Sequence, residues 1–128
     1  KLDKGWKCRT LSGGQKQRLA LAVNLVADKD IYVFDEATSN IDIESEAIIM
    51  RNIKAMSAEK SVIVISHRLA NVVPADNIYF MEEGEGKESG NHDQLMEVQG
   101  GYAKLFNAQK QLEEGYKEIT GVAAEVRA

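Results

Sequence analysis

The run Ile31–Glu36 reads IYVFDE, four branched or aromatic residues followed by two carboxylates. Such a short apolar run is typical of a buried strand, and of a parallel sheet in particular. Ligands of open α/β sheets bind at the carboxyl ends of the strands. Neighbouring side chains on an extended backbone point to opposite sides, so Asp35 and Glu36 could divide two tasks, Mg²⁺ binding and activation of water. Acids also occur at strand ends merely because the chain emerges into solvent, and that interpretation stays open here.

Upstream, the run Leu11–Gln15 reads LSGGQ and predicts the start of a helix. Ser12 suits the N-cap, and Gln15 stands where its side chain completes a capping box. Gly13 and Gly14 are weak helix formers, each costing about 1 kcal/mol relative to Ala in a helix interior. They leave backbone N–H groups open to an anion such as phosphate. These residues by themselves fit an ordinary capped helix and an anion site about equally well.

A helix is predicted between these two motifs, and a second helix and a second strand are predicted after them. Residues 15–27 have the period of a helix, and the apolar residues that share one face of it are Leu19, Ala22, Val23 and Val26. Asp42 is placed to cap a helix that ends near residue 56, and Ser61–Ile65 predicts a second buried strand. His67 follows that strand, on the same rim of the sheet as the two carboxylates. A lone histidine is more often structural than catalytic, but this placement favours a role in a site.

The remainder of the chain predicts short elements and one loop. Residues 69–73 form a short helix ended by a proline, and a strand follows over residues 77–81. The polar, glycine-rich stretch 82–90 lacks the alternation of a hairpin, so we expect a mobile loop. Helices are predicted over residues 92–98 and over residues 102–118. His92, at the start of the first of these helices, is expected to have a capping or packing role.

Composition narrows the class of protein. The 128 residues and 44% hydrophobic content fit one globular domain or part of one. The net charge of −4 argues against a dominant nucleic-acid surface. Cys8 is the only cysteine, so no internal disulfide can form, and no motif around it indicates catalysis. No apolar run is long enough to cross a bilayer and no signal segment is evident, so we expect a soluble polypeptide.

Taken in chain order, these motifs resemble those in the C-terminal half of an ABC transporter nucleotide-binding domain, exporter type. Leu11–Gln15 resembles the signature motif of that family, and Ile31–Glu36 resembles its Walker B strand with the following glutamate. Ser39–Asp42 resembles the D-loop, and His67 resembles the switch histidine. The resemblance covers nearly the whole chain. It implies an α/β fold with an incomplete P-loop NTPase (RecA-like) core, in which a mostly parallel sheet is flanked by helices and lacks the P-loop strand.

The resemblance also implies a division of labour within one domain over residues 1–128. Its parts would be a signature loop and helix at 11–27, Walker B and D-loop at 31–42, a strand with the switch histidine at 61–67, and a C-terminal strand and helices at 77–112. ATP and Mg²⁺ would be the cofactors. Asp35 would bind Mg²⁺, Glu36 would be the general base that activates water, and His67 would contact the γ-phosphate of ATP.

Other residues would act across a dimer of such domains. The resemblance implies that Ser12, Gly13, Gly14 and Gln15 close over ATP held by a second nucleotide-binding domain, and that Asp42 communicates across the interface. The remaining partner would be a transmembrane permease, with no role for nucleic acid. ATP hydrolysis would then power transport, and this segment would lie at the cytoplasmic face of the cell membrane.

The chain departs from the family pattern in two respects. No G-x-x-x-x-G-K-[ST] P-loop occurs in it, and no Q-loop precedes the signature motif. We therefore expect the chain alone to bind ATP weakly and to hydrolyse it negligibly. The P-loop strand would lie between the strands at 61–65 and 77–81, so the sheet should have a gap whose edges favour self-association or domain swapping. Gly86-Lys87 stands where the family has apolar hairpin residues, which weakens the case for a hairpin there.

Two other functions fit parts of the pattern. ATPases of DNA repair and chromosome maintenance share the signature motif, but they join their halves through long coiled coils, and this chain shows no upstream heptads. A non-catalytic module that dimerises with a complete ATPase, and lends it only the signature loop, is the second alternative. Sequence upstream of Lys1 that held a P-loop or membrane spans would discriminate between them.

Overall fold

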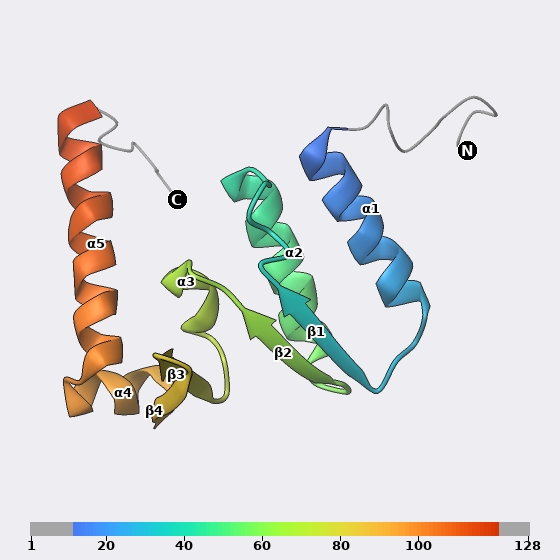
Figure 1. The fold of residues 1–128 in the computed structure, drawn as a ribbon. Coiled ribbons are helices and arrows are strands. Elements are labelled where there is room, and N and C mark those ends of the chain that lie inside the picture. Colours follow the sequence, from blue (N-terminus) through green and yellow to red (C-terminus); the bar gives the residue numbers. More distant parts are fainter. Residues whose placement is uncertain (1–11, 121–128) are drawn as a thin grey trace. The chain divides into compact units, whose positions relative to one another are not determined.

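The computed structural model describes residues 12–120, which form two compact units, one ending at His67 and the other beginning at Arg68. Leu11 and Cys8, named above, lie outside the described residues. Figure 1 labels the helices and strands. The first unit contains α1 (Gly13–Val26), β1 (Ile31–Asp35), α2 (Ile43–Met56) and β2 (Ser61–Ile65). The second contains α3 (Leu69–Val72), β3 (Ile78–Glu82), β4 (Glu85–Gly90), α4 (His92–Val98) and α5 (Gly101–Thr120).

The first unit is built on a parallel pair of strands, as predicted. β1 and β2 run in register until Asp35 stands opposite Ile65. The core lies between α1, α2 and one face of this pair, and its buried members are Leu21, Tyr32, Phe34 and Ile53. Val62 and Val64 of β2 pack against the same cluster. Both helices therefore cover the same face of the sheet.

The opposite face of this sheet is apolar but exposed. Its residues are Ile31, Val33, Ile63 and Ile65, with exposed fractions of 61%, 60%, 52% and 49%. The expected burial of both strands is thus correct for one face only, because the helices described in this unit cover only one side. The apolar face predicted for α1 is also exposed, with Val26 at 85%, and Leu21 contacts the core instead.

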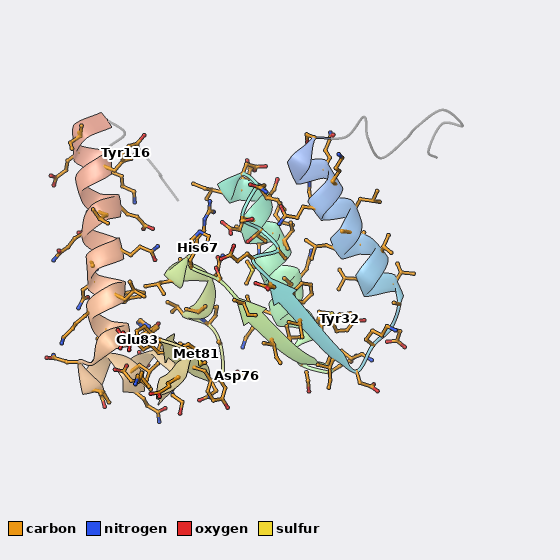
Figure 2. All side chains as sticks on the ribbon, in the orientation of Figure 1. Tyr32, His67, Asp76, Met81, Glu83 and Tyr116 are labelled. Atoms are coloured by element: carbon orange, nitrogen blue, oxygen red, sulfur yellow. The ribbon has the colours of Figure 1, made fainter. Side chains whose placement is uncertain are left out.

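The stretch expected to be a mobile loop, residues 82–90, contains the turn and the second strand of a β-hairpin, β3–β4, so that expectation was wrong. β3 and β4 pair antiparallel, with a β-bulge between Phe80 and Met81. The connection is the two-residue turn Glu83-Gly84, in which φ is 50° and 79° (Glu83 and Met81 are labelled in Figure 2). Positive φ at both central residues matches the twist of the adjoining strands, and glycine adopts it without strain. Turn geometry rather than apolar alternation therefore explains the hairpin.

The helices of the second unit pack on this hairpin. Buried residues of its core are Leu69, Ile78, Leu95 and Tyr102. The Glu88 carboxylate accepts hydrogen bonds from the backbone N–H groups of Gly101 (2.6 Å) and Tyr102 (3.2 Å), and so joins β4 to the start of α5. A carboxylate at this end also interacts favourably with the helix dipole. His92 lies 2.9 Å from the Tyr102 hydroxyl through Nδ1, which confirms its packing role.

The strands described within residues 12–120 form two separate two-stranded sheets, β1–β2 parallel and β3–β4 antiparallel. No hydrogen bonds join β2 to β3, and the gap expected between these strands stays a prediction. The fold class is α/β, with small sheets flanked by helices, and the parallel pairing is confined to the first unit.

Candidate functional site

The candidate site lies in the first unit, where the carboxyl ends of β1 and β2 meet the amino ends of α1 and α2. All four ends lie at the same end of the unit (Figure 1). Parallel pairing sets Asp35 beside Ile65, so the residues that follow the two strands, Glu36 and His67, come close in space. Helix amino ends add partial positive charge and unpaired N–H groups to this end.

Glu36 is held through its backbone at two points. Its N–H donates to the carbonyl oxygen of Ile65 at 2.8 Å, and its own carbonyl oxygen accepts from Nε2 of Gln17 at 3.1 Å. Its φ is 48°, in the left-handed region that non-glycine residues rarely occupy. Glu36 therefore does not continue the extended strand as expected from the sequence. Backbone strain of this kind persists where surrounding contacts enforce it, and it is concentrated at functional sites.

The Glu36 side chain contacts the predicted histidine. Its Oε1 lies 3.1 Å from Nδ1 of His67, which is labelled in Figure 2. The Glu36 side chain is 52% exposed and the His67 side chain is 65% exposed, so both keep surface available to a ligand. A carboxylate oriented by an imidazole is a suitable acceptor for a proton from water, and the imidazole can in turn donate a hydrogen bond to a phosphate oxygen.

Gln17 is a site residue that the sequence did not reveal, since it lies in the predicted helix 15–27 but not among the residues of its apolar face. Its amide reaches across to the Glu36 carbonyl from the helix that the LSGGQ motif begins. Its Oε1 is buried and has no hydrogen-bond partner within the described part of the chain. The contact joins residues 19 apart in the sequence, so no local pattern could have identified this glutamine.

Asp35 is the last residue of β1 and is exposed. Alternation along the strand places it on the face opposite the core. No cluster of three or more His, Cys, Asp or Glu side chains in residues 12–120 could hold a metal ion. One carboxylate cannot by itself complete the coordination of a metal ion. It nevertheless fits Mg²⁺, which keeps several waters and is usually bound by one or two carboxylates together with substrate phosphates.

The loop between β1 and α2 is fixed by a buried pair and a helix cap. Thr38 Oγ1 donates to Glu46 Oε1 at 2.6 Å, and both residues are buried. Asp42 caps α2, as predicted, by accepting a hydrogen bond from the Ser45 N–H at 2.9 Å. This bond lowers the pKa of the Asp42 carboxyl below its ordinary value of 3.8. In this structure the Asp42 carboxylate therefore serves its own helix.

The capping box predicted at the start of α1 is present. Gln15 N–H donates to Ser12 Oγ at 3.2 Å, and Ser12 N–H donates to Gln15 Oε1 at 2.9 Å. Gly13 and Gly14 form the first turn of the helix. Among the predicted site residues, side-chain hydrogen bonds thus join Glu36 to His67 and Ser12 to Gln15.

Known proteins are similar to this chain in sequence and in fold. A family model described as ABC transporter matches residues 2–39. An uncharacterized ABC transporter ATP-binding protein of Haemophilus influenzae is 54% identical over 104 residues, which are 81% of this chain and 19% of the relative. The chain belongs to the ABC transporter family. The Toxin RTX-III translocation ATP-binding protein of Actinobacillus pleuropneumoniae is 50% identical over 97 residues, 76% of this chain and 14% of the relative.

Further family members extend the likeness to exporters. The ABC multidrug transporter MDR2 of Trichophyton rubrum is 43% identical over 116 residues, 91% of this chain and 9% of the relative. A solved structure of a bacterial Atm1-family ABC exporter with ATP bound matches with a TM-score of 0.74 and 37% identity, over 79% of this chain and 18% of that chain. The predicted family and fold class are confirmed. The present chain spans only 9% to 19% of the length of the three relatives found by sequence.

Among the helices that the structure describes within residues 12–120, none is both long enough and apolar enough to cross a bilayer.

Proposed function

We propose that this chain is the C-terminal part of an ATP-hydrolysing subunit of an ABC exporter, with the four segments that the motifs define. The observation that carries the proposal is the 3.1 Å contact between Glu36 and His67 at the carboxyl ends of two parallel strands. The relatives described above are named as transporters, a translocation protein and an ATP-binding protein, which favours transport over DNA repair.

Glu36 would act as the general base that takes a proton from the attacking water. General-base assistance contributes roughly 10²- to 10⁴-fold in rate. The hydrogen bonds of its backbone to Ile65 and Gln17 support this role, because they fix the position of the backbone from which the carboxylate side chain extends. His67 would hold the Glu36 carboxylate from one side and donate a hydrogen bond to the γ-phosphate, where charge develops in the transition state.

Asp35 would hold Mg²⁺ through water, and the ion supplies charge neutralisation of the phosphates when it is bound. Ser12, Gly13, Gly14 and Gln15 would contact ATP on a second nucleotide-binding domain. The capping box supports this role, because it sets the first backbone N–H groups of α1 at the helix amino end, where anions bind.

The remaining assignments concern partners. Asp42 would lie at the interface between two nucleotide-binding domains, and a transmembrane permease would be the other partner, at the cytoplasmic face of the membrane. The chain by itself would hydrolyse ATP negligibly, because its sequence holds no P-loop to supply the lysine and amides that bind phosphate. The exposed sheet face and strand edges would favour self-association or domain swapping of the isolated chain.

A chimera tests the catalytic proposal. The segment of the Haemophilus influenzae relative that matches this chain would be replaced by this chain, so that the relative supplies the rest of its ATP-binding domain. We expect the chimera to hydrolyse ATP, and Glu36→Gln to lower kcat by about 10²- to 10⁴-fold while ATP binding is retained. Glu59→Gln, the same change in the exposed turn after α2, is the matched control and should leave kcat unchanged.

Two outcomes would contradict the proposal. A Glu36→Gln chimera that turns over ATP as fast as its parent would exclude Glu36 as the general base. Steady ATP turnover by the isolated 128-residue chain, abolished by the same substitution, would exclude dependence on an absent P-loop.

A further inference from the structure

Helix α5 carries a solvent-exposed apolar stripe. Leu105, Leu112 and Ile119 recur every seven residues and are 50%, 75% and 87% exposed. Ala108 and Gly115 stand between them, at the intermediate positions of the same heptad pattern. The stripe spans 14 residue steps, or about 21 Å of helix. We call these five residues the α5 stripe.

The second unit itself leaves the α5 stripe uncovered. α5 packs on the core of its unit through Tyr102 and Phe106, which lie in its first turns on a neighbouring face, and Ala103 is also buried there. Figure 1 shows the later turns of α5 extending beyond α4 and the β3–β4 hairpin. An exposed apolar stripe at heptad spacing is the pattern by which one helix binds another.

We propose that the α5 stripe binds the α5 stripe of a second copy of this chain, with the two helices antiparallel. In this register Leu105 faces Gly115 of the second copy, and Leu112 faces Ala108. Each large side chain then fills the space above a small one, which is how well-packed layers interdigitate. Among the residues that the structure describes, and apart from the nearby backbone of α5 itself, no atom lies within 4 Å of a Cβ built at Gly115, so a neighbouring helix can approach closely there.

Charge complementarity supports the same register. Lys104 and Glu118 flank the stripe near its two ends and occupy equivalent heptad positions. Antiparallel pairing sets Lys104 against Glu118 of the second copy, and twofold symmetry makes this pair twice. Within one helix the two residues are about 21 Å apart and cannot pair. Charged residues at such flanking positions determine partner and orientation in coiled coils.

A parallel arrangement explains these residues less well. It would set Leu105 against Leu105 and Gly115 against Gly115, and the glycine layer would leave an unfilled space. Lys104 would then lie near Gln109 of the second copy rather than near a carboxylate. Gln109 is already engaged in its own unit, where its Oε1 accepts from the Leu69 N–H at 3.0 Å.

The contact between two such stripes is small, so the association should be weak. About four helical turns bury less area than a stable interface of standard size. We therefore expect a dimer that forms at high protein concentration, on the order of 0.1–1 mM. The proposal concerns a different surface from the ATP site and does not depend on the proposed catalytic roles.

Sedimentation equilibrium of the complete 128-residue chain tests the pairing. Leu112→Gln should weaken dimerisation at least about 10-fold, and Lys104→Glu alone about 3- to 10-fold. The double variant Lys104→Glu/Glu118→Lys should restore the parent affinity, because the pair is reversed across the two copies. Lys110→Glu, an equal charge change on another face of α5 with the side chain 63% exposed, is the matched control and should have no such effect.

The charge variants separate pairing from folding. Glu at 104 and Lys at 118 both suit the helix dipole, so a weaker dimer in the single variant cannot be attributed to a weaker helix. A chain that stays monomeric to about 1 mM would overturn the proposal. So would dimerisation that ignores Leu112→Gln and Lys104→Glu but is lost in Ile63→Gln, since association would then use the exposed face of the β1–β2 sheet.

Discussion

Adding one methyl group at Gly101 should destabilise the second unit, although the same change at Gly115 should stabilise it. Both glycines lie in α5. A Cβ at Gly101 would stand 2.6 Å from Cε1 of Phe80, whereas ordinary van der Waals contact begins at 3.4 Å. The ring or the backbone must therefore move by about 0.8 Å. Phe80 packs against the core of this unit, so the ring cannot simply swing into solvent.

The expected magnitudes follow from these two environments. Overpacking of this kind costs about 1–3 kcal/mol, and the gain in helix propensity from Gly to Ala, at most about 1 kcal/mol, is smaller at the first residue of a helix. Gly101→Ala should therefore lower the free energy of unfolding by about 1–2 kcal/mol. A Cβ at Gly115 meets no atom within 4 Å in residues 12–120 outside the backbone of its own helix, so Gly115→Ala should raise the free energy of unfolding by up to about 1 kcal/mol.

Hydrogen exchange of the α4 and α5 amides, measured at low protein concentration, reports the unfolding of this unit without contributions from the other one. Gly101→Ala should accelerate exchange of the protected amides, and Gly115→Ala should slow it. Equal protection in the two variants would refute the argument, because it would mean that Phe80 yields to the methyl group without cost.

Three further changes have defined outcomes. Asp42→Asn keeps the acceptor that caps α2 but removes the titrating carboxyl group. Because folding lowers the pKa of Asp42, its stabilisation is present above the unfolded value near 3.8 and is lost as the pH falls through the folded pKa. Below about pH 4, Tm of the parent should therefore fall more steeply than Tm of the variant. Glu83→Asn should stabilise the hairpin by about 0.5–1 kcal/mol in urea unfolding, because Asn tolerates φ of 50° better than Glu. Leu95→Ala, at a side chain only 1% exposed, should cost about 2–5 kcal/mol in the same assay, and a loss under 1 kcal/mol would contradict its place in the core.

Local chemistry accounts for what the sequence predicted well. The Ser12–Gln15 capping box and the Asp42 cap depend on side chains bonding to backbone within three residues, and both are present. Parallel pairing of β1 and β2 followed from apolar runs joined through a helix. The approach of Glu36 to His67 followed in turn, because the carboxyl ends of parallel neighbours share one rim.

The misses depend on contacts or dihedral angles that a pattern does not contain. The hairpin at residues 78–90 forms because Glu83 and Gly84 take positive φ, which apolar alternation does not report. Glu36 leaves the extended region because its N–H and carbonyl are bonded on both sides. The Gln17 contact spans 19 residues, and nothing in the local sequence distinguishes this glutamine from a solvated one.

The mistaken burial of β1, β2 and the α1 face has a common cause. Apolar runs report the burial that a segment has in its complete domain, whereas exposure in the structure reports only the elements present around it. Ile31, Val33, Ile63 and Ile65 all face the side of the sheet that neither α1 nor α2 covers. The family relatives are several times longer than this chain, which matches between 9% and 19% of their length. We infer that the apolar residues that are exposed on this face of the β1–β2 sheet mark where the remainder of an ATP-binding domain would pack. Polar substitutions on this face should therefore impair the folding of the chimera more than the folding of the isolated chain.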